Sequence, residues 1–164
     1  VDLYPYKALF AKEAVHMVMV AHAAYPNLRL QERDQSGRLL PSSLSRSVVN
    51  GLLRDKMGFD GIAITDDLEM GAILKGFGIE EACRLALSAG EDMLAICAGD
   101  TAIRNGYAAV LEAGNSGELT EDRVDTSVSR IERLRSTIPP APQMDTTLIA
   151  GSTNEIKALK SRLI

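Results

Sequence analysis

The sequence predicts an α/β fold in which parallel strands alternate with helices. Three short apolar runs, at 15–21, 62–65 and 92–97, are separated by segments whose apolar residues recur at helical spacing. Each helical segment returns to the next strand through a short connection, which favours consecutive right-handed βα units. These observations place three strands side by side in one parallel sheet covered by helices.

The first third of the chain is expected to supply a helix, a strand and a long loop. A helix is predicted over 2–14, with Pro5 in its first turn. Residues 15–21 form a near-continuous apolar run, which is typical of a strand buried on both faces. The polar stretch 25–40 predicts a long loop beyond the carboxyl end of that strand.

The middle of the chain carries the second strand between two helices. An apolar stripe predicts a helix over 45–57, which Gly58 ends. The strand at 62–65 leads through a glycine-containing loop to a helix over 80–88, closed by Gly90. This region is therefore a helix–strand–helix unit.

The last part of the chain adds the third strand and two covering helices. Cys97 lies inside the expected strand 92–97, and Cys83 lies in the preceding helix, so both are expected to be small buried hydrophobes. Helices are predicted over 100–113 and after Thr120, which is a good N-cap.

A proline cluster at 139–142 ends regular structure. We therefore expect residues 1–138 to form one unit and residues 139–164 to be a linker or the start of an appended region.

Composition describes a globular piece and disfavours two classes of partner. A chain of 164 residues, 46% hydrophobic and 24% charged, can bury one core and has no apolar run long enough to span a membrane. The net charge of -4, with basic residues scattered among acids, provides no basic stripe for nucleic acid.

Neither a metal nor another cofactor is expected, because no metal-ligand spacing occurs. The two cysteines form no disulfide framework, which favours the cytoplasm. The start at Val1, without a signal peptide, indicates a fragment.

Two carboxylates follow the second strand. Asp66 and Asp67 come directly after the run 62–65, and reactive groups of parallel α/β folds gather at the carboxyl ends of strands. Side chains alternate along a strand, so only one of the two can face a pocket directly, and the sequence leaves open which one. Two other interpretations stay open, since Asp67 can cap the following turn and either acid can be a solvated surface residue.

Six segments of the chain form a recognisable series of motifs. They are VAHAAYP at 20–26, PSSLS at 41–45, GLLR at 51–54, GFDG at 58–61, TDDLEMGA at 65–72 and AGEDML at 89–94. In this order they resemble the family 3 glycoside hydrolases, and within that family the bacterial β-N-acetylhexosaminidases that trim N-acetylglucosamine from cell-wall fragments. The resemblance runs from about Leu3 to Ile138.

The resemblance implies a fold and a set of site residues. The fold is the C-terminal portion of a (β/α)₈ TIM-type barrel, which as a whole needs about 250 residues. Asp66, the first Asp of the Ser/Thr-Asp-x-Leu-x-Met motif, is implied to be the nucleophile of a retaining glycosidase. His22 is implied to lie in the loop region around the sugar, and Met70 to contact the sugar near the nucleophile. A hydrogen-bonding structural role for His22 and a core-filling role for Met70 stay open.

The family's acid/base dyad and its sugar-binding Lys-His pair are not expected in this chain. The resemblance implies an Asp-x-His dyad as acid/base and a Lys-His pair that binds the sugar, both upstream of Val1. His16 and His22 are the two histidines here, and neither follows the Asp-x-His pattern. The acid/base is therefore not expected within these residues.

The implied substrate is a terminal β-linked N-acetylglucosaminide, from muropeptides in peptidoglycan recycling. One alternative is a β-glucosidase or β-xylosidase of the same family; the β-glucosidase branch usually carries Trp after the nucleophile, and this chain has no Trp. A second alternative is a non-catalytic fragment. A receiver-like phosphoacceptor module that binds Mg²⁺ is disfavoured, because its acidic pair follows the first strand rather than the second.

Overall fold

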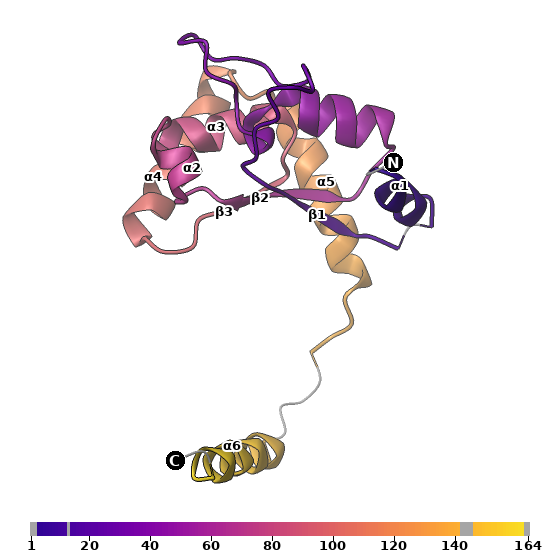
Figure 1. Cartoon of the computed structure of the whole chain (residues 1–164), viewed down its shortest axis with the longest axis vertical. Helices are drawn as coiled ribbons and strands as arrows, with labels where there is room; N and C mark the ends of the chain where they lie inside the picture. The colour runs from indigo at the N-terminus through magenta and orange to yellow at the C-terminus, as the bar shows by residue number, and fades with distance from the viewer. Residues whose placement is uncertain (1–2, 13, 142–145, 163–164) are drawn as a thin grey trace.

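The sheet has three parallel strands in the order β1-β2-β3 (Figure 1). A computed structural model of the chain describes residues 3–12, 14–141 and 146–162. The strands are β1 Met17–Val20, β2 Ile62–Asp67 and β3 Met93–Ala95. The parallel α/β arrangement predicted from the sequence is confirmed.

The predicted helices are present with shifted ends. The α-helices are α1 Tyr4–Phe10, α2 Gly71–Leu74, α3 Ile79–Ala89, α4 Asp100–Ser116, α5 Glu121–Thr137 and α6 Thr146–Lys160. Of these, the short helix α2 lies in the predicted glycine-containing loop and α6 lies in the predicted linker or appended region. A 3₁₀ turn, η1 Ser42–Leu44, precedes the helix η2 Ser47–Lys56, which is wound as a π-helix rather than an α-helix. The Met57 amide accordingly donates to the Leu52 carbonyl five residues back.

Two helix ends follow the predicted capping. Gly90 closes α3 in the left-handed region, with φ at +118°, where a side chain would be strained. The Thr120 hydroxyl accepts a hydrogen bond from the Arg123 amide in the first turn of α5. Both helices therefore begin or end where local chemistry satisfies their terminal backbone groups.

The core lies between the helices and one face of the sheet, in two clusters. One cluster joins η1, α2 and α3 to the end of β2, and its buried residues are Leu44, Leu68, Ile73, Phe77, Ile79, Ala82, Cys83 and Ala86. The other joins η2 to β1 and β2, and its buried residues are Val20, Val49, Leu53, Phe59, Ala63 and Ala89. Gly61 permits the close approach of β1 and β2, because a Cβ there would lie 2.5 Å from the His16 carbonyl oxygen.

The opposite face of the sheet is bare, which corrects the expectation of a fully buried first strand. Met17 and Met19 of β1 are 40% and 61% exposed. Met19 pairs with Ile64 in β2, and Ile64 pairs with the exposed Met93 in β3, so these side chains form a row across the sheet. The described helices cover one face only. Parallel sheets are normally covered on both faces, so this apolar row is unfilled core surface.

The second correction concerns Cys97. Strand β3 ends at Ala95, so Cys97 lies in the loop before α4 and is exposed rather than buried in a strand. Cys83 is buried in α3 as expected, and burial raises the pKa of its thiol to about 11.

Helix α6 lies away from the sheet in Figure 1, and all of its residues are exposed. Across the described parts of the chain, no helix is both long enough and apolar enough to cross a membrane.

The amino end of the sheet is fixed by a buried ion-pair network around Asp92. Its carboxylate accepts hydrogen bonds from the Arg54 guanidinium at 2.6 Å, the Ser127 hydroxyl at 2.7 Å and the Ala63 amide at 3.0 Å. Arg130 of α5 adds a fourth contact at 3.2 Å. Both carboxylate oxygens are thereby paired, which a buried charge requires. The network attaches η2 and α5 to the strands.

Glu91, beside this network, is fully buried, and neither of its carboxylate oxygens has a hydrogen-bond partner in the part of the chain that the structure describes. Burial raises the pKa of Glu91 to about 9 from 4.5, although the nearby Arg54 opposes the shift. The folded state therefore holds one more proton than the unfolded state between these values. Stability supplied by the protonated acid is complete below pH 4.5 and is lost as pH rises toward 9.

We expect Glu91→Gln to remove this pH dependence. In the wild type, the free energy of unfolding should fall by up to about 1.4 kcal/mol per pH unit because of this one proton. The uncharged glutamine should make the variant the more stable protein at pH 8, with the difference shrinking toward pH 4.5. Urea unfolding across this range measures it, with the exposed Glu112→Gln as control. Parallel pH profiles for wild type and Glu91→Gln would contradict the expectation.

Candidate functional site

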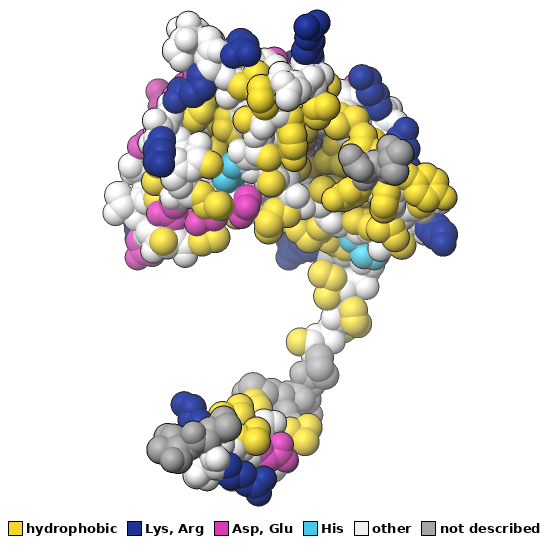
Figure 2. Space-filling view, viewed as in Figure 1, with side chains coloured by type: hydrophobic (Ala, Val, Ile, Leu, Met, Phe, Trp, Pro, Cys, Tyr) yellow, Lys and Arg dark blue, Asp and Glu magenta, His cyan; other side chains and the backbone are white. Residues whose placement is uncertain are grey.

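Asp66 and Asp67 are the last two residues of β2, at the carboxyl edge of the sheet. The strand is longer than the predicted 62–65, because Asp67 still pairs with Ala95 of β3. Figure 2 shows acidic side chains gathered in this region with a histidine beside them, next to apolar surface. The acids thus sit where parallel sheets place reactive groups.

The pairing of β2 with β3 is interrupted at this point by a bulge. Ile64 is opposite Met93 and Asp67 is opposite Ala95, so Thr65 and Asp66 together face the single residue Leu94. Bulges of this kind bend a strand locally and re-aim the side chains within it. Simple alternation along β2 therefore does not decide which of the two acids is available.

Asp67 is held by hydrogen bonds from two backbone amides at one of its two carboxylate oxygens. Its Oδ1 accepts from the Glu69 amide at 3.0 Å and from the Cys97 amide at 3.3 Å. This carboxylate caps the turn after β2 and ties that turn to the loop after β3. Turn capping was one of the interpretations that the sequence left open for Asp67.

Asp66 has fewer attachments. Its Oδ1 accepts from the Asp67 amide at 2.8 Å, and within the described residues its Oδ2 has no hydrogen-bond partner. The side chain is half-buried. One oxygen is thus fixed by the backbone while the other is available to an incoming atom.

Glu69 holds the neighbouring loop in place. Its Oε2 accepts from the amides of Ala98 at 2.6 Å and Gly99 at 3.2 Å, directly before α4. Partial desolvation, followed by the negative charges of Asp67, Glu69 and Asp66, raises the pKa of the Cys97 thiol. The β3–α4 loop therefore borders the acidic strand end.

His22 connects the loop after β1 to the end of β2. Its Nε2 lies 2.9 Å from the Asp67 carbonyl oxygen and its Nδ1 lies 2.7 Å from the Ser43 Oγ. Because a carbonyl oxygen only accepts, Nε2 carries a proton, and in the neutral ring Nδ1 accepts from the Ser43 hydroxyl. Both ring nitrogens are engaged within the protein, and a contact of His22 with sugar stays a prediction.

Met70 follows the acids directly. It is 44% exposed in this chain, and its carbonyl accepts from the Ile73 amide at the start of α2. A contact between Met70 and a sugar remains a prediction.

Sequence reasoning gave no role to Thr65 and Ser43, which are both fully buried: Ser43 is bonded to His22, and Thr65 accepts from the Ala95 amide. Their partners lie at least 21 residues away along the chain, so no local pattern marks them.

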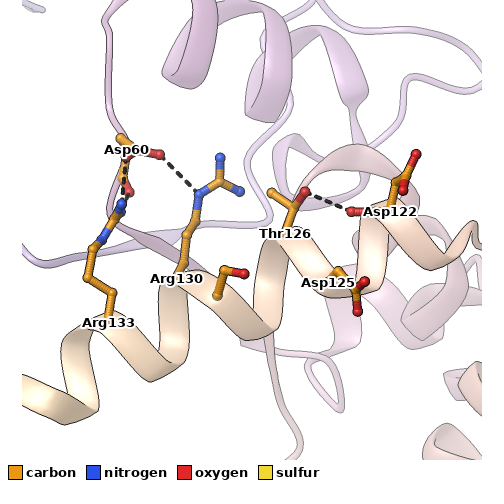
Figure 3. Close-up of a pocket in the computed structure, with 7 residues that line it drawn as sticks. Asp60, Asp122, Asp125, Thr126, Arg130 and Arg133 are labelled. Carbon is orange, nitrogen blue, oxygen red and sulfur yellow. Dashed lines mark hydrogen bonds and ion pairs between the residues drawn. The ribbon is translucent and has the colours of Figure 1, made fainter.

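A separate hollow of about 430 Å³ lies at the opposite end of β2 (Figure 3). Its Asp60 pairs with Arg130 at 3.3 Å and with Arg133 at 2.9 Å, and both arginines come from α5. These charges satisfy one another and fasten α5 to the residue before β2. The hollow is remote from Asp66, and its composition is that of a structural contact.

Residues 1–134 match the sequence model described as the glycosyl hydrolase family 3 N terminal domain. A β-hexosaminidase of Bordetella pertussis is 30% identical over 99% of this chain and 40% of its own length. β-Hexosaminidase A of Pseudoalteromonas piscicida is 26% identical over 93% of this chain and 27% of its own length.

A solved family 3 β-N-acetylglucosaminidase from Paenibacillus superposes with a TM-score of 0.78 at 32% identity. The match covers 89% of this chain and 27% of that protein. The chain thus spans well under half the length of each of these relatives, and the similarity covers nearly all of the residues described above.

Proposed function

This chain belongs to glycosyl hydrolase family 3, and from that membership we propose that the full-length protein is a retaining β-N-acetylhexosaminidase. Asp66 is its nucleophile. The observation that carries this proposal is the place of the Asp66 carboxylate at the end of β2, with one oxygen held by the Asp67 amide and the other without a hydrogen-bond partner among the described residues. Asp67 and Glu69 are engaged by backbone amides and serve as supports.

The reaction proceeds in two steps. The Oδ2 of Asp66 attacks the anomeric carbon, the glycosidic C–O bond breaks, and the leaving oxygen takes a proton from the acid/base residue. A covalent glycosyl ester on Asp66 results. Water, activated by the same acid/base residue, then attacks the anomeric carbon and releases the sugar and the free carboxylate.

The proposed substrate is a terminal β-linked N-acetylglucosaminide of peptidoglycan-derived fragments. Two observations support it: the relatives named above are β-hexosaminidases and a β-N-acetylglucosaminidase, and Asp67 rather than Trp follows the nucleophile. We place the reaction in the cytoplasm, where the free thiols of Cys83 and Cys97 would stay reduced.

The substrate proposal predicts a measurable preference. The full-length protein should cleave an aryl β-N-acetylglucosaminide with a kcat/KM at least about 10²-fold above that for the matching aryl β-glucoside, because a site built to hydrogen-bond the acetamido group leaves polar groups unpaired when it is missing. Both substrates carry the same leaving group, which is the control for aglycone effects. Equal or faster cleavage of the glucoside would favour the β-glucosidase alternative.

A further inference from the structure

We propose that the Thr65 hydroxyl positions the nucleophile by holding open the bulge that contains Asp66. This inference rests on the proposed role of Asp66 and adds a positioning residue to it. Thr65 does not touch the reacting atoms, because it is 0% exposed.

Within the bulge, the Thr65 side chain supplies a hydrogen-bond acceptor to the neighbouring strand. On the β1 side the ladder is regular as far as the pair Val20 and Thr65. On the β3 side the register shifts, and the Ala95 amide donates to the Thr65 Oγ1 at 3.0 Å. This bond joins the half-buried Ala95 amide of β3 to the side chain of a residue inside the bulge, so it helps to satisfy that amide where the register shifts.

Pairing resumes immediately beyond the bulge. The Leu68 amide donates to the Ala95 carbonyl at 2.9 Å, so Ala95 is bound on both its donor and its acceptor. The two bonds hold one β3 residue against a β2 segment that is one residue too long for regular pairing. The extra length falls at Thr65 and Asp66.

Loss of the hydroxyl should therefore close the bulge. Without Oγ1, the bulged register loses the bond from the Ala95 amide, so a slip of β2 by one residue toward regular pairing becomes less unfavourable. A slip of one residue turns the following side chains to the opposite face of the sheet. The Asp66 carboxylate would leave its position, and Asp67 would lose its contact with the Cys97 amide.

The test compares Thr65→Val, which keeps the shape and removes the hydroxyl, with Thr65→Ser, which keeps the hydroxyl. Thr65→Val should lower kcat about 10²-fold with little change in KM, because misplacement of a reacting group by about 1 Å costs that much. Thr65→Ser should stay near the wild type. Thr65→Ala serves as a second variant without the hydroxyl in case Thr65→Val does not fold.

Ser127→Ala is the matched control. Its hydroxyl is also buried, donates to Asp92 and accepts from Arg123 at the other end of the sheet, so the variant loses two hydrogen bonds far from Asp66. It should unfold at a lower temperature and keep the wild-type kcat. A fall in kcat in proportion to lost stability in both variants would mean that Thr65 is only structural, which would overturn the proposal.

A second measurement separates failure of this inference from failure of the proposed function. Hydrogen–deuterium exchange of segment 93–97 should speed up in Thr65→Val and Thr65→Ala but not in Thr65→Ser, whether or not the protein hydrolyses glycosides. If the wild type cleaves no aryl glycoside, the proposed function fails while exchange still reports on the bulge. Unchanged exchange in the variants without the hydroxyl, or equal loss of activity in Thr65→Ser, would overturn the role given to the hydroxyl.

Discussion

Replacement of Asp66 by alanine is expected to abolish glycoside hydrolysis by the full-length protein while leaving its fold intact. The carboxylate forms the covalent bond to the anomeric carbon, and loss of a nucleophile in a covalent mechanism typically costs at least about 10⁴-fold in kcat. The cost in stability should be small, since the one hydrogen bond at the Asp66 carboxylate joins it to the amide of the next residue.

The measurement is kcat with an aryl β-N-acetylglucosaminide, together with a thermal unfolding curve. Asp55→Ala, which removes an exposed acid from η2, is the control and should retain wild-type kcat. A slowly hydrolysed fluorinated glycoside should modify Asp66 and no other residue, as read by mass spectrometry of the labelled peptide. Label on Asp67 or Glu69 would reassign the nucleophile.

The sequence allowed the order of the elements and the place of Asp66 to be predicted, because both depend on local patterns. An apolar run followed by acids marks the end of β2, and Thr120 and Gly90 cap helices through contacts within one turn. The roles of Asp66, Asp67 and Glu69 could not be separated in this way. Their separation depends on the register between β2 and β3, which lie about thirty residues apart.

The two wrong predictions, burial of the first strand on both faces and burial of Cys97 in a strand, have the same origin. The run at 15–21 is apolar enough for a strand buried on both faces, yet the helices of this chain cover one face only, and Met19 remains 61% exposed. Cys97 extends an apolar run but lies beyond the last paired residue of β3. The backbone amide of Cys97 donates to the carboxylate of Asp67 rather than to a neighbouring strand. Hydrophobicity alone does not reveal where pairing stops.

A protein consisting of residues 1–164 alone is expected to show no glycosidase activity, even with Asp66 intact. Acid/base assistance typically contributes about 10²–10⁴-fold, and these residues contain no Asp-x-His dyad. His22 does not replace it, because both of its ring nitrogens are bound, to Ser43 and to the Asp67 carbonyl. Three strands also cannot close around the sugar to exclude water from the anomeric carbon.

The bare face of the sheet gives this isolated chain a second expected property. The row formed by Met19, Ile64 and Met93 and the unpaired edges of β1 and β3 favour self-association, so the protein should elute from a size-exclusion column above its monomer mass of 17.7 kDa. Assay of each fraction with an aryl β-N-acetylglucosaminide tests activity, with the full-length protein as reference. Turnover near that of the full-length protein, lost in Asp66→Ala, would locate an acid/base group within these residues. It would contradict the inference that the acid/base residue lies outside them.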